Sequence, residues 1–254
     1  MRSLFFVILV SISIFAQEAN LVQPESQQAQ SNFVNDFSDE FETKDVEIFD
    51  PLSGYNRVMT NFNDGFYTNV LTPVARGYAY VIPEPARVGV SNVFDNLFFP
   101  IRFINNILQF KFLNASEELG RFVINSTFGL LGIMDVAKDL GLKAHKEDFG
   151  QTLGYYGVGS GFHVVIPFLG PSNVRDIFGL GVDSFGDVTS SNMAYEPYRI
   201  PNDAEETLGI KTFQIVNRTS LHLNEYENLK KDAIDLYPFL RDIYEQRRKK
   251  QIEE

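Results

Sequence analysis

The chain has 254 residues, a formal net charge of −11 at pH 7 and no cysteine. Without cysteine there are no disulfides, thiolate zinc sites, cysteine nucleophiles or lipid-modified cysteines. The acidic net charge argues against nucleic acid as a partner, because proteins that bind nucleic acid need a basic surface to release counterions. The 24 phenylalanines, with no tryptophan, indicate either apolar surface that meets something other than water or ordinary dense packing.

The first residues have the pattern of a secretory signal peptide. One arginine precedes a short apolar run from Leu4 to Phe15, and Ala16 follows it. This run is short for a membrane span, so we predict a signal peptide over residues 1–16, with an uncleaved anchor as the alternative. Residues 17–44 are rich in Gln, Ser, Asn and acidic residues and predict a disordered acidic tether. We expect a single folded domain over residues 45–254.

Helical patterns dominate the predicted domain. Between Val93 and Leu113, apolar residues recur at three- and four-residue spacing, which predicts an amphipathic helix that Pro100 kinks or splits. This apolar face is either embedded in lipid at a membrane interface or buried in a soluble bundle. It consists of Phe94, Phe98, Ile101, Ile104 and Leu108.

Two later helices are predicted from capping boxes. Asn114 with Glu117 opens one of them, and Asp203 with Glu206 opens the other. A helical face also continues from Leu221 to the end of the chain. The strand-like run FHVVIPF is short and is interrupted by a proline. The predicted fold class is therefore all-α.

A glycine-rich stretch from Phe149 to Asn173 raises the possibility of a phosphate-binding loop, which its residues do not support. Phe and His, instead of Lys and Ser/Thr, follow Gly161, and the glycine spacing does not fit a dinucleotide fingerprint or a nucleophile elbow. Two structural roles stay open for these glycines. They either hinge a mobile apolar loop or form a tight loop with no moving part.

The sequence does not describe an enzyme. The three histidines, His145, His163 and His222, have no metal-ligand spacing, and His163 is better explained as a packed or surface residue than as a ligand or base. Paired glutamates lie in predicted first helical turns, where they favour the helix dipole. No nucleophile, base and orienting group can be assembled. We therefore predict no catalytic residue, no metal and no cofactor.

Four strings occur in a recognisable order and at a recognisable spacing. They are DPLSGYNRVMTNFND (Asp50–Asp64), VIPEPARVGVSN (Val81–Asn92), FVINSTFGLLGIMDVA (Phe122–Ala137) and FGQTLGYYGVGSGFHVVIPFLGPSNVRD (Phe149–Asp176). Together they resemble the MlaA/VacJ family of outer-membrane phospholipid-transport proteins. The resemblance covers most of the chain from residue 50 to about residue 200.

The resemblance implies a ring-shaped bundle of amphipathic helices in the membrane interface, with a glycine-rich channel loop. It implies that phospholipids misplaced in the outer leaflet of the outer membrane enter an amphipathic channel and leave on the periplasmic side. A soluble periplasmic carrier, MlaC in the family, takes them onward, and a trimeric porin often holds the ring. Phospholipid and the outer membrane are then the partners, without nucleic acid or any cofactor.

Site residues follow from the same resemblance, position by position. Gly157, Gly159 and Gly161 are the expected hinges of the channel loop. The expected channel or lipid contacts are Tyr155, Tyr156, Phe162, Val164 and Ile166. Asn61, Phe62 and Asn63 fall on an early helix that helps to seal the ring, and the face from Phe94 to Leu108 is the expected embedded surface.

One feature departs from the family pattern. Its members are commonly lipoproteins with a lipidated cysteine after the signal sequence, and this chain has none. Attachment is then expected from the embedded helices, a partner or an uncleaved signal segment. Two other functions stay open: a structural or adaptor protein on the membrane surface that moves no lipid, and a lipid-modifying enzyme such as a phospholipase, which the missing catalytic motifs disfavour.

Overall fold

The computed structural model describes residues 50–231 and 233–254 of the chain. The predicted signal peptide (1–16) and the predicted tether (17–44) lie outside the described residues, as do residues 45–49 of the predicted domain. Residues Asp50–Glu254 form one compact unit.

The described unit is mostly helical, as predicted. Its first half contains α3 (Ser53–Phe66), the π-helical segment η1 (Tyr67–Leu71), α4 (Thr72–Val81), α5 (Glu84–Leu97), α6 (Phe99–Leu108), α7 (Phe112–Thr127), α8 (Val136–Asp139) and α9 (Phe149–Tyr155). The second half contains β1 (His163–Ile166), β2 (Gly170–Asn173), α10 (Val174–Asp183), the 3-10 helix η2 (Glu196–Tyr198), α11 (Ala204–Leu221), α12 (Glu225–Lys231) and α13 (Leu236–Glu253). None of the described helices combines the length and the apolar character needed to cross a membrane.

Local sequence signals explain several helix boundaries. α5 ends at Leu97 and α6 begins at Phe99, with Pro100 in its first turn, where a missing backbone N–H costs no helical hydrogen bond. The predicted split at this proline is confirmed. Asp203 caps α11 by accepting a hydrogen bond from Glu206 N at 2.9 Å, also as predicted. The capping role predicted for Asn114 is wrong, because α7 already begins at Phe112.

The hairpin is the exception to the helical fold. β1 pairs with β2 in antiparallel register, with His163 opposite Asn173 and Ile166 opposite Gly170. The tight turn between the strands places Phe168 in the left-handed region, at φ +65°. The sequence of β2, GPSN, has no strand propensity, and its extended backbone is imposed by pairing with β1.

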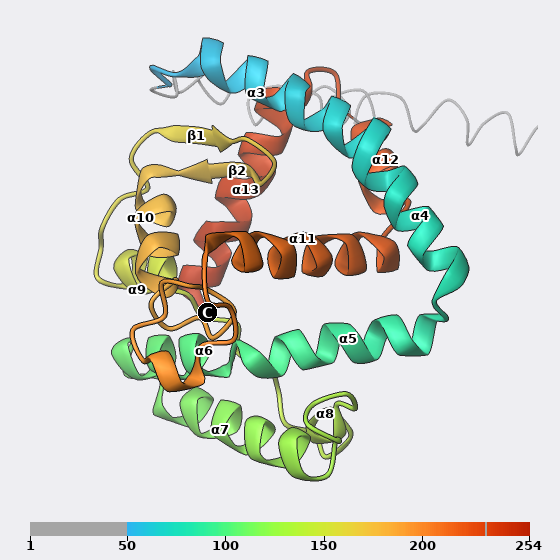
Figure 1. Cartoon of the computed structure of the whole chain (residues 1–254). Coiled ribbons are helices and arrows are strands. Elements are labelled where there is room, and N and C mark those ends of the chain that lie inside the picture. The colour runs from blue at the N-terminus through green and yellow to red at the C-terminus, as the bar shows by residue number, and fades with distance from the viewer. Residues whose placement is uncertain (1–49, 232) are drawn as a thin grey trace, which may run out of the picture. The chain divides into compact units, whose positions relative to one another are not determined.

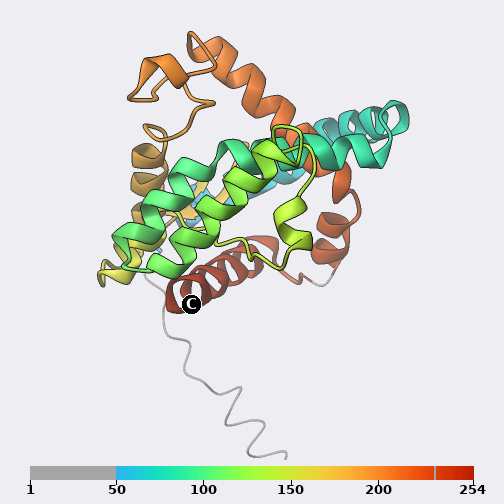
Figure 2. The same cartoon turned by 90° about the horizontal axis from the view of Figure 1, so that it is seen from below.

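Neighbouring elements contact one another in a closed series. From α3 the contacts run through η1, α4, α11, α5, α6, α9 and α10 to the hairpin, which contacts α3 again (Figure 1). α7 packs along α6, and α13 contacts α9, β2 and α3. Seen from below, α6 and α7 lie side by side (Figure 2). This series is compatible with the ring that the resemblance implies.

Candidate functional site

The described unit is polar inside and apolar outside. Its buried apolar side chains are Ala75, Ala115, Ala137, Val165, Pro201 and Tyr237. Buried polar and charged side chains come from almost every helix, and include Asn56, Arg87, Asn105, Asn106, Gln109, Glu118, Gln151, Asp176, Asn217 and Arg248. A water-soluble domain shows the opposite distribution, because burial of apolar surface stabilises it.

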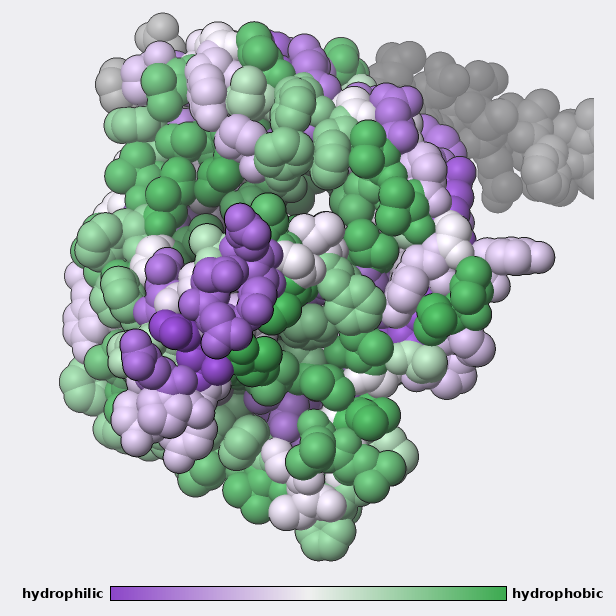
Figure 3. Space-filling view, in the orientation of Figure 1, coloured by the Kyte–Doolittle hydropathy of each residue, from purple (hydrophilic) through white to green (hydrophobic). Residues whose placement is uncertain are grey.

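Large apolar side chains accordingly lie on the surface. Exposed examples are Val74, Tyr80 and Val81 on α4, Ile104, Ile107 and Leu108 on α6, Leu119 and Val123 on α7, and Phe178 and Leu180 on α10. In the space-filling view, hydrophobic residues cover much of the visible face, and one hydrophilic patch lies near its centre (Figure 3). Apolar surface of this extent indicates a neighbour other than water.

The inward face of α6 supplies a hydrogen-bonded polar cluster. Asn105 Nδ2 donates to Asp183 Oδ1 at 3.0 Å, and Thr152 Oγ1 donates to Asn105 Oδ1 at 2.8 Å. Gln109 Nε2 donates to Glu147 Oε2 at 2.9 Å. α6 is thereby joined to α9 and α10 through amide and hydroxyl groups, while its side chains Ile104, Ile107 and Leu108 are exposed.

Asp183 is one of two carboxyl groups in this cluster, with Glu147. Burial raises its pKa to about 6, although hydrogen bonds from Phe149 N and Asn105 favour the charged form. Its ordinary value is 3.8, so the folded state holds a proton that the unfolded state has already released. The resulting stabilisation is full below about pH 4 and is lost as pH rises through about 6.

We therefore expect Asp183→Asn to flatten the stability profile between pH 4 and pH 7. In the unchanged protein, the stabilisation that protonated Asp183 provides should fall by about 1–3 kcal/mol as pH rises over that range, since one pKa unit corresponds to about 1.4 kcal/mol. Urea unfolding in mild detergent at several pH values measures the slope. An unchanged slope in Asp183→Asn would assign the pH dependence to another group.

An ion network around the buried Arg248 joins the last helix to the two ends of the glycine-rich segment. The Arg248 guanidinium donates to Asp148 at 2.7 and 2.8 Å and to Asp176 at 2.9 and 3.0 Å. Burial opposes ionisation of Asp176, but hydrogen bonds from Arg248 and Arg175 outweigh it and hold the pKa of Asp176 below its ordinary value. Gly150 makes room for this network, because a Cβ there would lie 2.5 Å from Asp176 Oδ1.

Two asparagines of α3 hold the first strand of the hairpin. Asn56 Nδ2 donates to His163 O at 3.0 Å, and Val165 N donates to Asn56 Oδ1 at 2.8 Å. Seven residues later on α3, Asn63 Nδ2 donates to Ile166 O at 2.9 Å, and Phe168 N donates to Asn63 Oδ1 at 2.7 Å. Seven residues bring both side chains to the same face of a helix. The two amides therefore bond to the backbone of β1 and its turn as a neighbouring strand would.

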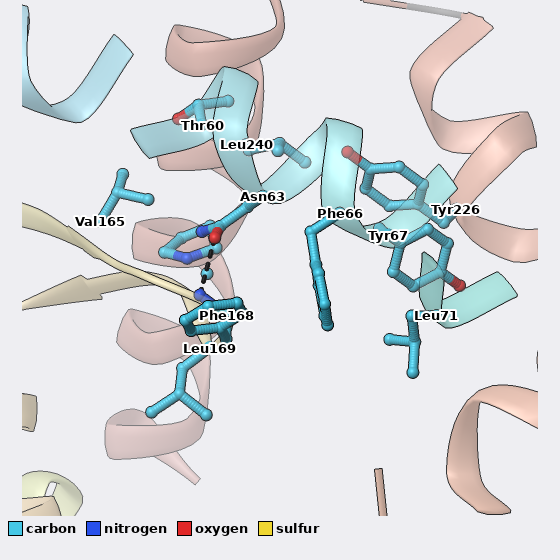
Figure 4. A pocket seen from close by; sticks show the side chains of 12 residues that line it. Thr60, Asn63, Phe66, Tyr67, Leu71, Val165, Phe168, Leu169, Tyr226 and Leu240 are labelled. Carbon is cyan, nitrogen blue, oxygen red and sulfur yellow. Dashed lines mark hydrogen bonds between the residues drawn. The ribbon is translucent and has the colours of Figure 1, made fainter. Parts of the chain in front are cut away.

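A cavity of about 190 Å³ lies beside this clamp. Its walls come from α3, η1, the hairpin turn, α12 and α13, and the space-filling view is hollowed between α3, α4 and α11 (Figure 3). Figure 4 shows Phe168 and Leu169 on one side, Leu71 and Tyr226 on the other, and Phe66 between them. The lining is mainly apolar, with Thr60 and Asn63 as polar members.

Aromatic contacts fix the hairpin turn as one wall of this cavity. The Phe168 ring meets Phe62 and Phe66 edge to face, with centroid distances of 5.1 and 4.9 Å. Opposite it, the Tyr226 ring lies 4.2 Å from that of Tyr67. The wall formed by Phe168 depends on the Asn63 clamp, whereas the wall formed by Tyr226 depends on α12.

The predicted channel-loop glycines differ in their surroundings. Gly157, at φ +82°, ends α9, and its N–H donates to Gly154 O at 2.9 Å. Gly161 also has a positive φ, of +71°, and lies against Val174. Gly159 has open space around it. Gly157 and Gly161 therefore satisfy backbone geometry that glycine favours, and the hinge role of all three stays a prediction.

The predicted lipid contacts fall on two surfaces. Tyr155 and Tyr156 are exposed at the end of α9, and Tyr156 OH donates to Leu108 O at 2.5 Å. Phe162, Val164 and Ile166 are half-buried, and the Ile166 carbonyl belongs to the clamp described above. None of these five side chains lines the cavity beside α3.

The predicted ring-sealing residues are partly brought together with the hairpin. Asn63 bonds to it and Phe62 packs against its turn, while Asn61 is exposed. The predicted embedded face does not lie on one surface either. Phe94 packs against Phe213 of α11, at 6.2 Å between centroids, and Lys211 lies over the Phe98 ring at 4.7 Å. Ile101 is half-buried, and Ile104 and Leu108 are exposed.

His163 is a packed histidine, as expected. It is buried between the rings of Tyr237 and Tyr244, and its Nδ1 lies 3.4 Å from Glu245 Oε1. Within the part of the chain that the structure describes, no group of three or more histidines and acidic residues could hold a metal ion.

Three comparisons relate the chain to known proteins. The family model described as MlaA lipoprotein matches residues 48–251. The intermembrane phospholipid transport system lipoprotein MlaA of Escherichia coli (strain K12) is 39% identical over 145 residues, which make up 56% of this chain and 58% of that protein. An uncharacterised protein of Rickettsia typhi is 27% identical over 208 residues, or 82% of this chain and 80% of its own length.

One solved structure has a similar fold. It is described as "Structural basis for maintenance of bacterial outer membrane lipid asymmetry", and it matches with a TM-score of 0.66 and 30% sequence identity. The match covers 80% of this chain and 98% of that chain.

Proposed function

Because the chain belongs to the MlaA lipoprotein family, we propose that it removes mislocalised phospholipid from the outer leaflet of the outer membrane. The lipid passes through an amphipathic channel and is handed to a periplasmic carrier, so that the lipid asymmetry of the membrane is maintained. The E. coli relative is named as part of an intermembrane phospholipid transport system, and the similar solved structure concerns lipid asymmetry.

The observation that carries this proposal is the inverted distribution of side chains. A phospholipid has an apolar part and a charged head group, and a protein that moves it must offer each part a suitable neighbour. Exposed apolar side chains suit contact with acyl chains, and the hydrogen-bonded interior of asparagines, acids and arginines suits a polar head group. The cavity beside α3 is mainly apolar, as acyl chains require, with Thr60 and Asn63 as its polar members.

Partners and location follow from the same proposal. The protein acts at the periplasmic side of the outer membrane, held there by its exposed apolar faces, and a soluble MlaC-like carrier receives the lipid. A trimeric porin is a further partner. The protein itself supplies no energy source, so the direction of transfer comes from the difference in lipid affinity between membrane and carrier.

The channel-loop hinge is testable at Gly159. Proline suits this position better than Gly157, whose φ of +82° proline cannot adopt. We expect Gly159→Pro to stay folded but to raise the amount of phospholipid in the outer leaflet, because a stiffened loop cannot open. Labelling of lipids accessible from outside the cell measures that amount.

Gly159→Ala is the matched control, since it adds a methyl group in open space without fixing the backbone. A hinge predicts near-normal transport in the alanine variant and loss in the proline variant. Equal loss in both variants, or normal transport in both, would contradict the hinge.

The alternative of an adaptor that moves no lipid makes a different prediction. A transporter purified in mild detergent should retain phospholipid, detectable by mass spectrometry of an organic extract. An adaptor should not retain lipid beyond the amount found with an unrelated membrane-surface protein.

A further inference from the structure

The loop between α7 and α8 carries five exposed apolar side chains within seven residues. Residues 128–134, FGLLGIM, contain no charged side chain. We call this segment the apolar loop. Leu131 is 78% exposed and Leu130 is 62% exposed, and Phe128, Ile133 and Met134 are exposed beside them.

The backbone of the apolar loop is strained at its two most prominent residues. Leu130 and Leu131 have φ values of +52° and +59°, in the left-handed region that leucine rarely adopts. Glycine would occupy both positions without this cost. Leucine therefore lowers the stability of the fold at both positions while presenting two large apolar side chains to the outside.

Several backbone groups of the apolar loop form hydrogen bonds within the protein. Leu131 N donates to Ser126 O at 3.2 Å, Gly132 N donates to Asn125 O at 2.8 Å, and Met134 N donates to Gly129 O at 2.9 Å. The Ile133 carbonyl accepts from Asn92 Nδ2 at 2.9 Å. Each of these bonds pairs a backbone group that would otherwise need water, and unpaired backbone groups are costly where a segment contacts hydrocarbon.

Polar groups gather on the inner side of the same loop. Asn125 Nδ2 donates to Asp135 Oδ1 at 2.9 Å, and Arg121 donates to both Asp135 oxygens at 2.8 and 2.9 Å. Gly132 packs so closely on α5 that a Cβ there would lie 2.7 Å from Asn96 Cβ. The loop is thus a rigid cap, with polar groups bonded on the inside and only apolar side chains outside.

We propose that the apolar loop inserts Leu130 and Leu131 into the acyl-chain region of a lipid leaflet and anchors the protein there. A protein partner is the less suitable occupant, because a protein interface has a polar rim that pairs with polar groups of its partner, and this loop offers few. The inference deepens the membrane location proposed above and rests on it, but it does not depend on lipid transfer.

Single tryptophans test the insertion directly, because the chain has no tryptophan of its own. The full chain carrying Leu131→Trp is bound to vesicles of phosphatidylethanolamine and phosphatidylglycerol whose acyl chains are brominated. Tyr198→Trp is the control, since Tyr198 is exposed on η2 beside Arg199 and near Glu196. We expect strong bromine quenching and a blue-shifted emission for Leu131→Trp, and neither for the control.

The outcomes separate the two proposals. Binding to vesicles with equal, weak quenching of both tryptophans would overturn insertion of the loop and leave the membrane location intact. Failure of the full chain to bind vesicles would overturn both. Quenching only after a second protein is added would assign the loop to a protein partner and overturn its insertion.

A second variant separates anchoring from a structural role. Leu130→Gly with Leu131→Gly should raise the unfolding temperature in detergent, because the backbone strain is relieved. The same variant should weaken vesicle binding by roughly tenfold or more per leucine removed. A purely structural role predicts unchanged vesicle binding, and this result would overturn the proposal.

Discussion

Replacing Arg248 by methionine is expected to lower the free energy of unfolding by about 3 kcal/mol, because it leaves the buried carboxylate of Asp176 without its main partner. Arg248 is 6% exposed and bonds to Asp148 and Asp176 through four contacts of 2.7–3.0 Å. Arg175 still bonds to Asp176 at 3.0 Å. We therefore expect a loss of unfolding free energy at the lower end of the range that is typical when one partner of a buried ion pair is removed.

Urea unfolding in mild detergent measures this loss, and Lys249→Met is the matched control. Lys249 is the next residue in α13, but its side chain is 78% exposed. Its replacement should change the free energy of unfolding by no more than about 0.5 kcal/mol. Similar losses in the two variants would show that the network adds nothing beyond surface charge.

The effect of Arg248→Met should also depend on pH. The pKa of Asp176 is below its ordinary value of 3.8 in the folded chain, so its contribution is present above that value and is lost as pH falls through the folded pKa. The difference between the two proteins should therefore shrink in acid. Adding Asp176→Asn to Arg248→Met should recover part of the stability, because one unpaired charge is removed.

Replacing Asn63 by alanine is expected to free the hairpin turn that walls the cavity. The change removes a donor to Ile166 O and an acceptor from Phe168 N. The two hydrogen bonds contribute about 0.5–1.5 kcal/mol each, so the Phe168 amide should exchange with deuterium roughly 5- to 150-fold faster. Hydrogen exchange followed by mass spectrometry on peptides that contain the turn measures this change.

The neighbouring Asn61 provides the control for that experiment. It lies two residues earlier on α3, is exposed, and makes no hydrogen bond to the hairpin. Asn61→Ala should leave exchange at the turn unchanged. If Asn61→Ala and Asn63→Ala accelerated exchange equally, α3 would act through its overall stability and the clamp would have no specific role.

The sequence predicted the helices well, because their boundaries depend on local chemistry. Pro100 separates α5 from α6, and Asp203 caps α11, for reasons that lie within one helical turn. The second strand was not predicted, since GPSN is extended only through its pairing with β1. Asn114 looked like a cap, but α7 starts two residues earlier.

The candidate site was harder to predict from the sequence, because its contacts join segments that are distant in the chain. Asn56 bonds to a strand that begins more than a hundred residues later, and Arg248 binds two carboxylates that flank the glycine-rich segment, Asp148 and Asp176. The sequence carried a signal for the Asn56 contact, because Asn56 and Asn63 are seven residues apart on a predicted helix. Gly150 shows that some glycines of that segment serve close packing, a role that spacing alone does not distinguish from a hinge.

The amount of phospholipid in the outer leaflet of the outer membrane, in cells with and without this gene, tests the central claim most directly. Lipids accessible from outside are labelled and quantified. Retrograde phospholipid transport predicts a rise on deletion of the gene and a return to the original amount when the full chain is expressed again. An unchanged amount of outer-leaflet phospholipid after deletion would contradict the proposed function.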